Sequence, residues 1–205
     1  MIDTSRAEAV LSTINGDSNT AFFAELAAAG VDPEKVPVVN TSVGEDELRN
    51  IPLEHARGHL AAWSYFQTVP GDANRGWVDR FRREFGYDRV TSDPMEAAYT
   101  LVYAWKAAVE KAGSLETKAV RQALGEGIEV TAPGGPLAID PATQHAAKRF
   151  RLGRVRGDRQ FEIIHESDGP IPPDPYPPVA FPGWSCDWTA GGITRGAEVV
   201  IDGNF

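Results

Sequence analysis

The chain has 205 residues, of which 42% are hydrophobic and 24% are charged, and its formal net charge is -9. This balance is typical of a globular protein that buries a sizeable core. The acidic charge argues against a nucleic-acid or anionic-membrane partner, because both bind clustered Lys and Arg. The single cysteine, Cys186, excludes an internal disulfide and a multi-cysteine zinc site.

Early in the chain, an apolar strand over residues 9–14 runs into small polar residues, and a helix follows. Asp17 or Ser18 is expected to cap that helix, whose apolar face carries Phe22, Phe23 and Leu26. In open α/β sheets, ligands bind beyond the carboxyl ends of the strands, which favours a binding role for Asn15, Gly16 and Asp17. An ordinary strand-to-helix turn is the alternative.

A second junction of the same kind follows, where the apolar residues 36–39 lead into Asn40, Thr41 and Ser42. Gly30 ends the intervening helix. Residues 8–42 therefore predict strand, helix, strand, the repeating unit of a parallel sheet. The two polar strand ends are expected to converge on one ligand.

Residues 59–66 predict another strand, and three helices should follow it. The third of these is short and runs from Ser114 to Leu124. Two apolar stripes at helical spacing are expected in the core. They comprise Trp77, Phe81 and Phe85, and then Met95, Tyr99, Val102, Trp105 and Val109.

After Gly125 the pattern changes to short strands. Residues 149–155 and 160–164 predict a β-hairpin. Its buried faces should hold Phe150, Leu152, Phe161 and Ile163, with Arg151 and its neighbouring basic residues on a solvated face. The proline-rich residues 169–178 are expected to run extended.

No nucleotide-binding loop, nucleophile motif or zincin pattern occurs in the sequence. His55 and His59 have the spacing of two metal ligands on a helix, but Pro52 and Gly58 disfavour a helix there. We therefore expect no enzymatic activity, no metal and no cofactor.

Several separated segments resemble the second half of the periplasmic substrate-binding proteins of ABC transporters, in the Leu/Ile/Val-binding-like branch that binds urea and short-chain amides. The matching segments are residues 12–19, 58–66, 93–99 and 169–176. The resemblance implies an α/β fold of the type I periplasmic-binding-protein class, with two Rossmann-like lobes containing parallel sheets. The first lobe would be incomplete in this chain, which would expose apolar faces of the helices within residues 77–112.

In that scheme, residues 1–56 belong to the second lobe and residues 57–127 to the first. Residues 128–205 return to the second lobe and end in a proline-rich tail. The resemblance implies a pocket for urea or a short-chain amide between the lobes. The second lobe would contribute Asn15, Gly16, Asp17, Ser18, Thr41 and Ser42.

The implied function is non-catalytic capture of a solute for an ABC permease in the periplasm. Family chains are about twice as long and carry a secretion signal, which the polar residues Met1–Arg6 do not resemble. Two alternatives follow: a cytoplasmic amide-sensing regulator of the same fold, or a truncated fragment without function. The exposed helices would also allow a homodimer.

Overall fold

A computed structural model describes residues 6–202, which form two compact units. The first unit runs to Ala97 and includes Arg149–Asp168, and the second contains Ala98–Lys148 and the residues from Gly169 onward. Residues 1–5, noted above as polar, lie outside the described part. The units divide the chain at other points than the lobes implied by the resemblance, and that lobe assignment stays a prediction.

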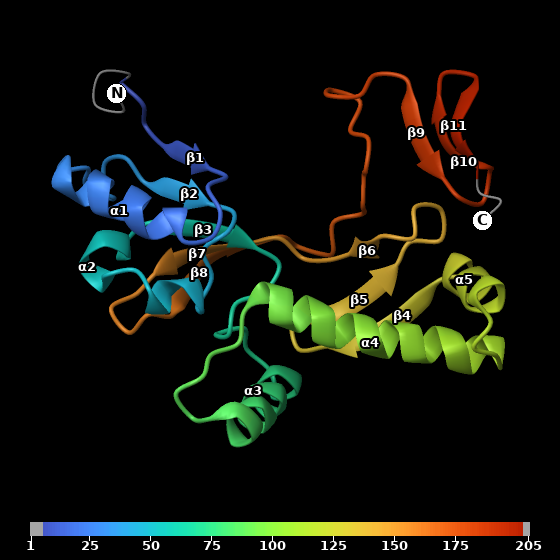
Figure 1. The fold of residues 1–205 in the computed structure, drawn as a ribbon, viewed down its shortest axis with the longest axis horizontal. Coiled ribbons are helices and arrows are strands. Elements are labelled where there is room, and N and C mark those ends of the chain that lie inside the picture. The colour runs from blue at the N-terminus through green and yellow to red at the C-terminus, as the bar shows by residue number, and fades with distance from the viewer. Residues whose placement is uncertain (1–5, 203–205) are drawn as a thin grey trace. The chain divides into compact units, whose positions relative to one another are not determined.

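The first unit is built on a five-stranded sheet of order β1-β2-β3-β7-β8 (Figure 1). β1, β2 and β3 are parallel, whereas β7 pairs antiparallel with β3 and β8 antiparallel with β7. The expected strand, helix, strand unit and the expected hairpin are both confirmed. The strands are β1 (Val10–Ser12), β2 (Val38–Asn40), β3 (Leu60–Trp63), β7 (Arg151–Val155) and β8 (Phe161–Glu166).

Three α-helices and a 3-10 helix accompany this sheet: α1 (Ser18–Ala28), η2 (Glu47–Arg49), α2 (Leu53–Ala56) and α3 (Asp72–Phe85). The expected side-chain cap of α1 is wrong, because Asp17 stands at the N-cap without a capping hydrogen bond. Its backbone is already helical there, at φ -63° and ψ -20°, whereas a capping residue has extended backbone. Gly30 does end the helix, with φ at +69°.

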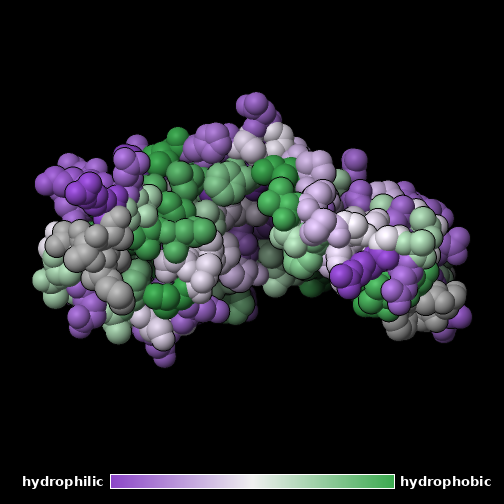
Figure 2. All heavy atoms as spheres, turned by 90° about the horizontal axis from the view of Figure 1, so that it is seen from above, coloured by the Kyte–Doolittle hydropathy of each residue, from purple (hydrophilic) through white to green (hydrophobic). Residues whose placement is uncertain are grey.

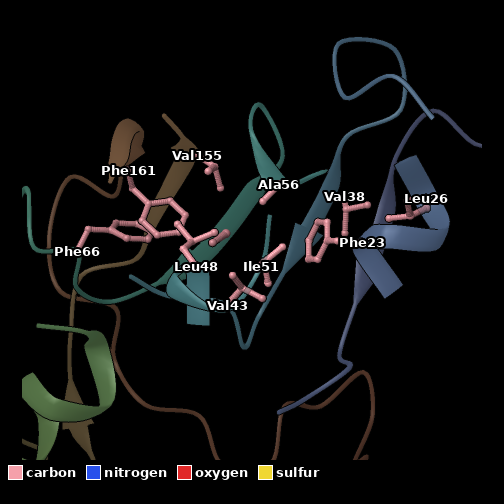
Figure 3. Close-up of a cluster of buried hydrophobic side chains, with 11 residues drawn as sticks. Phe23, Leu26, Val38, Val43, Leu48, Ile51, Ala56, Phe66, Val155 and Phe161 are labelled. Atoms are coloured by element: carbon pink, nitrogen blue, oxygen red, sulfur yellow. The ribbon is translucent and has the colours of Figure 1, made fainter. Parts of the chain in front are cut away.

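The core of the first unit lies between the sheet and α1, η2 and α2 (Figure 3). The expected pattern on β7 is wrong by one residue. Arg151, Gly153 and Val155 are buried, while Phe150 is exposed. The Arg151 guanidinium is satisfied inside because it donates to the Ser64 carbonyl and to the Glu166 carboxylate. Gly153 leaves room for Phe66 and Phe161, whose ring centroids are 4.6 Å apart.

The second unit contains most of α4 (Asp93–Ala112), all of α5 (Thr117–Gly125) and two three-stranded antiparallel sheets. Its core comes from α4, α5 and the sheet of order β4-β5-β6. None of the helices described within residues 6–202 is long and apolar enough to cross a membrane. The strands are β4 (Ile128–Ala132), β5 (Gly135–Ile139), β6 (Ala146–Ala147), β9 (Trp184–Asp187), β10 (Gly192–Arg195) and β11 (Glu198–Asp202).

The two predicted core stripes hold only in part. Trp77 is buried, but Phe85, at the other end of its stripe, is 62% exposed. On α4, the buried face carries Glu96, Thr100, Ala104 and Ala108, whereas Val102 and Trp105 are more than half exposed. Apolar side chains are also open to view on the face that Figure 2 draws. The exposure of apolar surface on these helices is what the resemblance implied.

Candidate functional site

The carboxyl ends of β1 and β2 lie side by side, because Ser12 pairs with Asn40 in a parallel register. Two hydroxyl groups beyond β2 reach back to the segment beyond β1. The Ser42 hydroxyl donates to the Ile14 carbonyl, and the Thr41 hydroxyl donates to the Ser12 carbonyl at 3.4 Å. The structure therefore brings together the two polar segments that the sequence singles out.

Two buried asparagines connect these segments. Asn40 belongs to the second polar strand end noted in the sequence, but neither Asn40 nor Asn19 was predicted as a binding residue. The side-chain Nδ2 of Asn40 donates to the side-chain Oδ1 of Asn19 at 3.1 Å. The side-chain Nδ2 of Asn19 in turn donates to the Ser42 hydroxyl at 3.2 Å. Both asparagines are 1% exposed, and buried amides remain inside only when they are hydrogen-bonded. An asparagine at the last position of a predicted buried strand was the signal that could have identified Asn40.

A pocket of about 130 Å³ opens beside this network. It is small compared with the roughly 300–1,000 Å³ of pockets for drug-sized ligands, so it suits a solute of a few heavy atoms. One side comes from the start of α1 and the other from the segment that follows β2. The lining residues are Gly16, Asp17, Asn19, Thr20, Asp46, Glu47, Asn50 and Ile51.

The predicted site residues differ in their relation to this pocket. Gly16 and Asp17 line it. Ser18 and Thr41 are exposed and are not among its lining residues, and Ser42 is committed to the network. The Asn15 side chain accepts a hydrogen bond from the Gly16 amide at 2.9 Å, which holds the turn. Asp46, Glu47 and Asn50 were not predicted as site residues. The acidic run that contains Asp46 and Glu47 is typical of a solvated helix start, and no pattern marks Asn50.

The pocket has an acidic lining. Asp17, Asp46 and Glu47 place three carboxylates around it. Arg49 lies 3.9 Å from Asp46 and 3.7 Å from the exposed Asp88, so its charge is shared. One Glu47 oxygen accepts a hydrogen bond from the Gly44 amide at 2.8 Å. The remaining lone pairs can accept hydrogen bonds from a solute that carries several N–H groups.

Of the two histidines at metal-ligand spacing, His59 has a structural partner. His59 is buried, and its Nδ1 accepts a hydrogen bond from the Val38 amide at 3.1 Å. Burial lowers the pKa of His59, which keeps the ring neutral and able to accept. Within residues 6–202, no group of three or more His, Cys, Asp or Glu side chains is arranged to hold a metal ion.

The sequence match decides the family. A model of the periplasmic binding protein domain matches residues 1–181. The chain belongs to this periplasmic binding protein family. The expected α/β fold of the type I class is confirmed, and its sheet in the first unit is mixed, with three parallel strands.

Solved structures of this family share the fold at low sequence identity. The solute-binding protein of an ABC transporter from Rhodopseudomonas palustris BisB5, in complex with 3,4-dihydroxybenzoic acid, is 20% identical with a TM-score of 0.72. The match covers 84% of this periplasmic binding protein chain and 48% of that one. The chain therefore spans about half the length of such structures.

Two curated relatives share shorter segments with this periplasmic binding protein chain. A Leu/Ile/Val-binding protein homolog from Brucella abortus is 28% identical over 102 residues, 50% of this chain and 26% of that protein. A limonene hydroxylase from Geobacillus stearothermophilus is 29% identical over 122 residues, 60% of this chain and 22% of that protein. The chain spans less than a third of either relative, so neither match brings an activity with it.

Proposed function

We propose that the chain is part of the solute-binding component of an ABC transporter and that it binds urea or a short-chain amide beyond β1 and β2. The observation that carries this proposal is the small pocket with three carboxylates, Asp17, Asp46 and Glu47. Urea and acetamide are small, neutral and rich in N–H donors, and carboxylate oxygens accept such hydrogen bonds.

The same lining disfavours an anionic solute. A carboxylate ligand such as a hydroxybenzoate would face three like charges, with Arg49 already shared between Asp46 and Asp88. We infer that the ligand differs from the 3,4-dihydroxybenzoic acid bound by the R. palustris protein. The same proposal includes a permease partner, a periplasmic site of action and a homodimer. It also assigns residues 1–56 and 128–205 to the second lobe and residues 57–127 to the first.

Thermal unfolding of the purified chain tests the choice of ligand. A ligand that binds only the folded state raises the melting temperature, by an amount that grows with its concentration. We expect millimolar urea or acetamide to raise it, and 4-hydroxybenzoate and leucine to leave it unchanged. Asp17→Asn should remove the rise, while Glu25→Asn, an exposed change on α1, should keep it. A rise with 4-hydroxybenzoate alone would overturn the amide proposal.

A further inference from the structure

One side of the pocket is formed by residues 43–51, called the pocket wall below. This segment supplies Asp46, Glu47, Asn50 and Ile51 to the lining. Its apolar residues Val43, Leu48 and Ile51 point into the core of the first unit (Figure 3). The wall contains only one turn of 3-10 helix. The shape of the pocket therefore depends on hydrogen bonds between the wall and residues outside it.

Three polar anchors hold the pocket wall. The Trp63 indole N–H donates to the Val43 carbonyl at 2.9 Å. The Arg159 guanidinium donates to the Leu48 carbonyl and, at 2.8 Å, to the Ile51 carbonyl. Between these two anchors, Glu45 Oε1 accepts a hydrogen bond from the backbone N–H of Gln67 at 2.6 Å, which ties the wall to the segment after β3.

Glu45 differs from the other two anchors because its charge state can change. It is 1% exposed, and its Oε2 is buried without a hydrogen-bond partner. The ionisable groups that act on it are the carboxyls of Glu47 in the wall and of Asp93 at the start of α4. The neutral Tyr65, after β3, also lies within electrostatic range of Glu45 and of Glu96. Arg151 on β7 is engaged with Ser64 and Glu166.

We propose that Glu45 is a positioning residue, which holds the pocket wall in its binding shape while its carboxyl group is uncharged and releases the wall when it ionises. This inference rests on the proposed binding function for its role in affinity, but its structural part does not. A buried carboxylate without a second partner and beside other carboxyls is costly, and movement toward water relieves that cost.

The electrostatics agree with this geometry. Burial raises the pKa of Glu45 to about 8, and the charges of Asp93 and Glu47 act in the same direction, against the hydrogen bond from Gln67. The carboxyl group is therefore mostly protonated at neutral pH. Ionisation above about pH 8 puts a charge in the buried site, and the pocket wall carries that charge on Glu45.

The structural part can be tested without a ligand, by the indole N–H resonances of the tryptophans in a ¹H–¹⁵N spectrum. Trp63→Phe assigns the signal of Trp63, whose indole bonds the wall. We expect this signal to shift as pH rises through about 8 in the wild type and to stay fixed in Glu45→Gln, which keeps an oxygen acceptor for Gln67 but cannot ionise. Glu54→Gln, the same change at an exposed position, should titrate as the wild type does.

A Trp63 signal that is constant in the wild type, or that titrates equally in Glu45→Gln, would overturn the proposal. A second measurement concerns affinity. For urea or acetamide, we expect binding to weaken by up to about tenfold per pH unit above pH 8 in the wild type, and to be pH-independent in Glu45→Gln. If neither solute binds at pH 7, the proposed function fails, whereas the indole signal still decides the role of Glu45.

Discussion

Gly153 shows at the scale of one residue how tightly the core of the first unit is packed. A Cβ atom at this position would lie 2.7 Å from one Phe66 ring atom and 3.1 Å from the Phe161 Cβ. Both phenylalanines are fully buried and their rings lie against each other, so neither can move aside without disturbing its neighbours. The glycine is thus required for space and not for backbone conformation.

We expect Gly153→Ala to lower the free energy of unfolding by about 1–3 kcal/mol, the usual cost of overpacking a core. Guanidinium chloride unfolding measures this change. Gly157→Ala is the matched control in the same hairpin, since a Cβ there has no neighbour within 4 Å. Equal stabilities of the two variants would show that the Phe66 and Phe161 rings can rearrange.

At the scale of elements, the part of α4 from Leu101 onward has two apolar faces and only one of them is covered. Ala104 and Ala108 are buried, whereas Leu101, Val102 and Trp105 are half or more exposed. Spacings of three and four residues place the last three on one stripe. A helix that is apolar on both sides is characteristic of a position between two layers.

The two faces of α4 should respond differently to substitution. We expect Ala108→Leu to lower the free energy of unfolding by about 1–3 kcal/mol, because the buried face has no room for three more carbons. Trp105→Gln should change it by less than about 1 kcal/mol in the isolated chain, because its indole is 53% exposed. Guanidinium chloride unfolding again measures both. A loss with Trp105→Gln as large as with Ala108→Leu would mean that the exposed face is covered in solution.

The elements were predictable where a pattern repeats along the chain. The first strand, helix, strand unit, the 151–166 hairpin and the long helix ending near Gly113 were all predicted from apolar spacing and turn residues. Periodicity alone did not identify which apolar face of α4 is buried. Arg151 was misplaced because only the folded chain shows that Ser64 and Glu166 satisfy its guanidinium inside.

The candidate site was predictable only in part, for a physical reason. Asn15 to Ser18 and Thr41 to Ser42 could be selected because ligands gather beyond parallel strands, and the structure does bring these segments together. The opposite side of the pocket comes from residues 43–51, which have no regular strand and only one turn of helix. Their position depends on Trp63, Gln67 and Arg159, which are distant in sequence.

At the scale of the whole molecule, two electrostatic effects act on stability in the same direction as pH rises. The net charge of -9 at pH 7 produces general repulsion among exposed carboxylates. Glu45 adds a specific effect, because burial raises its pKa to about 8 in the folded chain from an ordinary value of 4.5. Between pH 4.5 and about 8, the unfolded chain ionises this carboxyl group whereas the folded chain keeps it protonated. The stabilising contribution of the neutral form is therefore complete below pH 4.5 and is lost as pH rises toward about 8.

Salt and one substitution separate these effects. Salt screens the exposed charges but hardly affects a buried carboxyl. At about 0.5 M NaCl, we therefore expect the free energy of unfolding of the wild type still to fall between pH 4.5 and 8, by up to about 1.4 kcal/mol per pH unit from Glu45. The free energy of unfolding of Glu45→Gln should depend less on pH over this range and should exceed that of the wild type near pH 8, while Glu54→Gln should follow the wild type.

Denaturation with guanidinium chloride cannot be run at low salt, so thermal unfolding at both salt concentrations is the suitable measurement. Parallel pH profiles for Glu45→Gln and the wild type would mean that Glu45 is solvated, and that general repulsion alone accounts for the pH dependence.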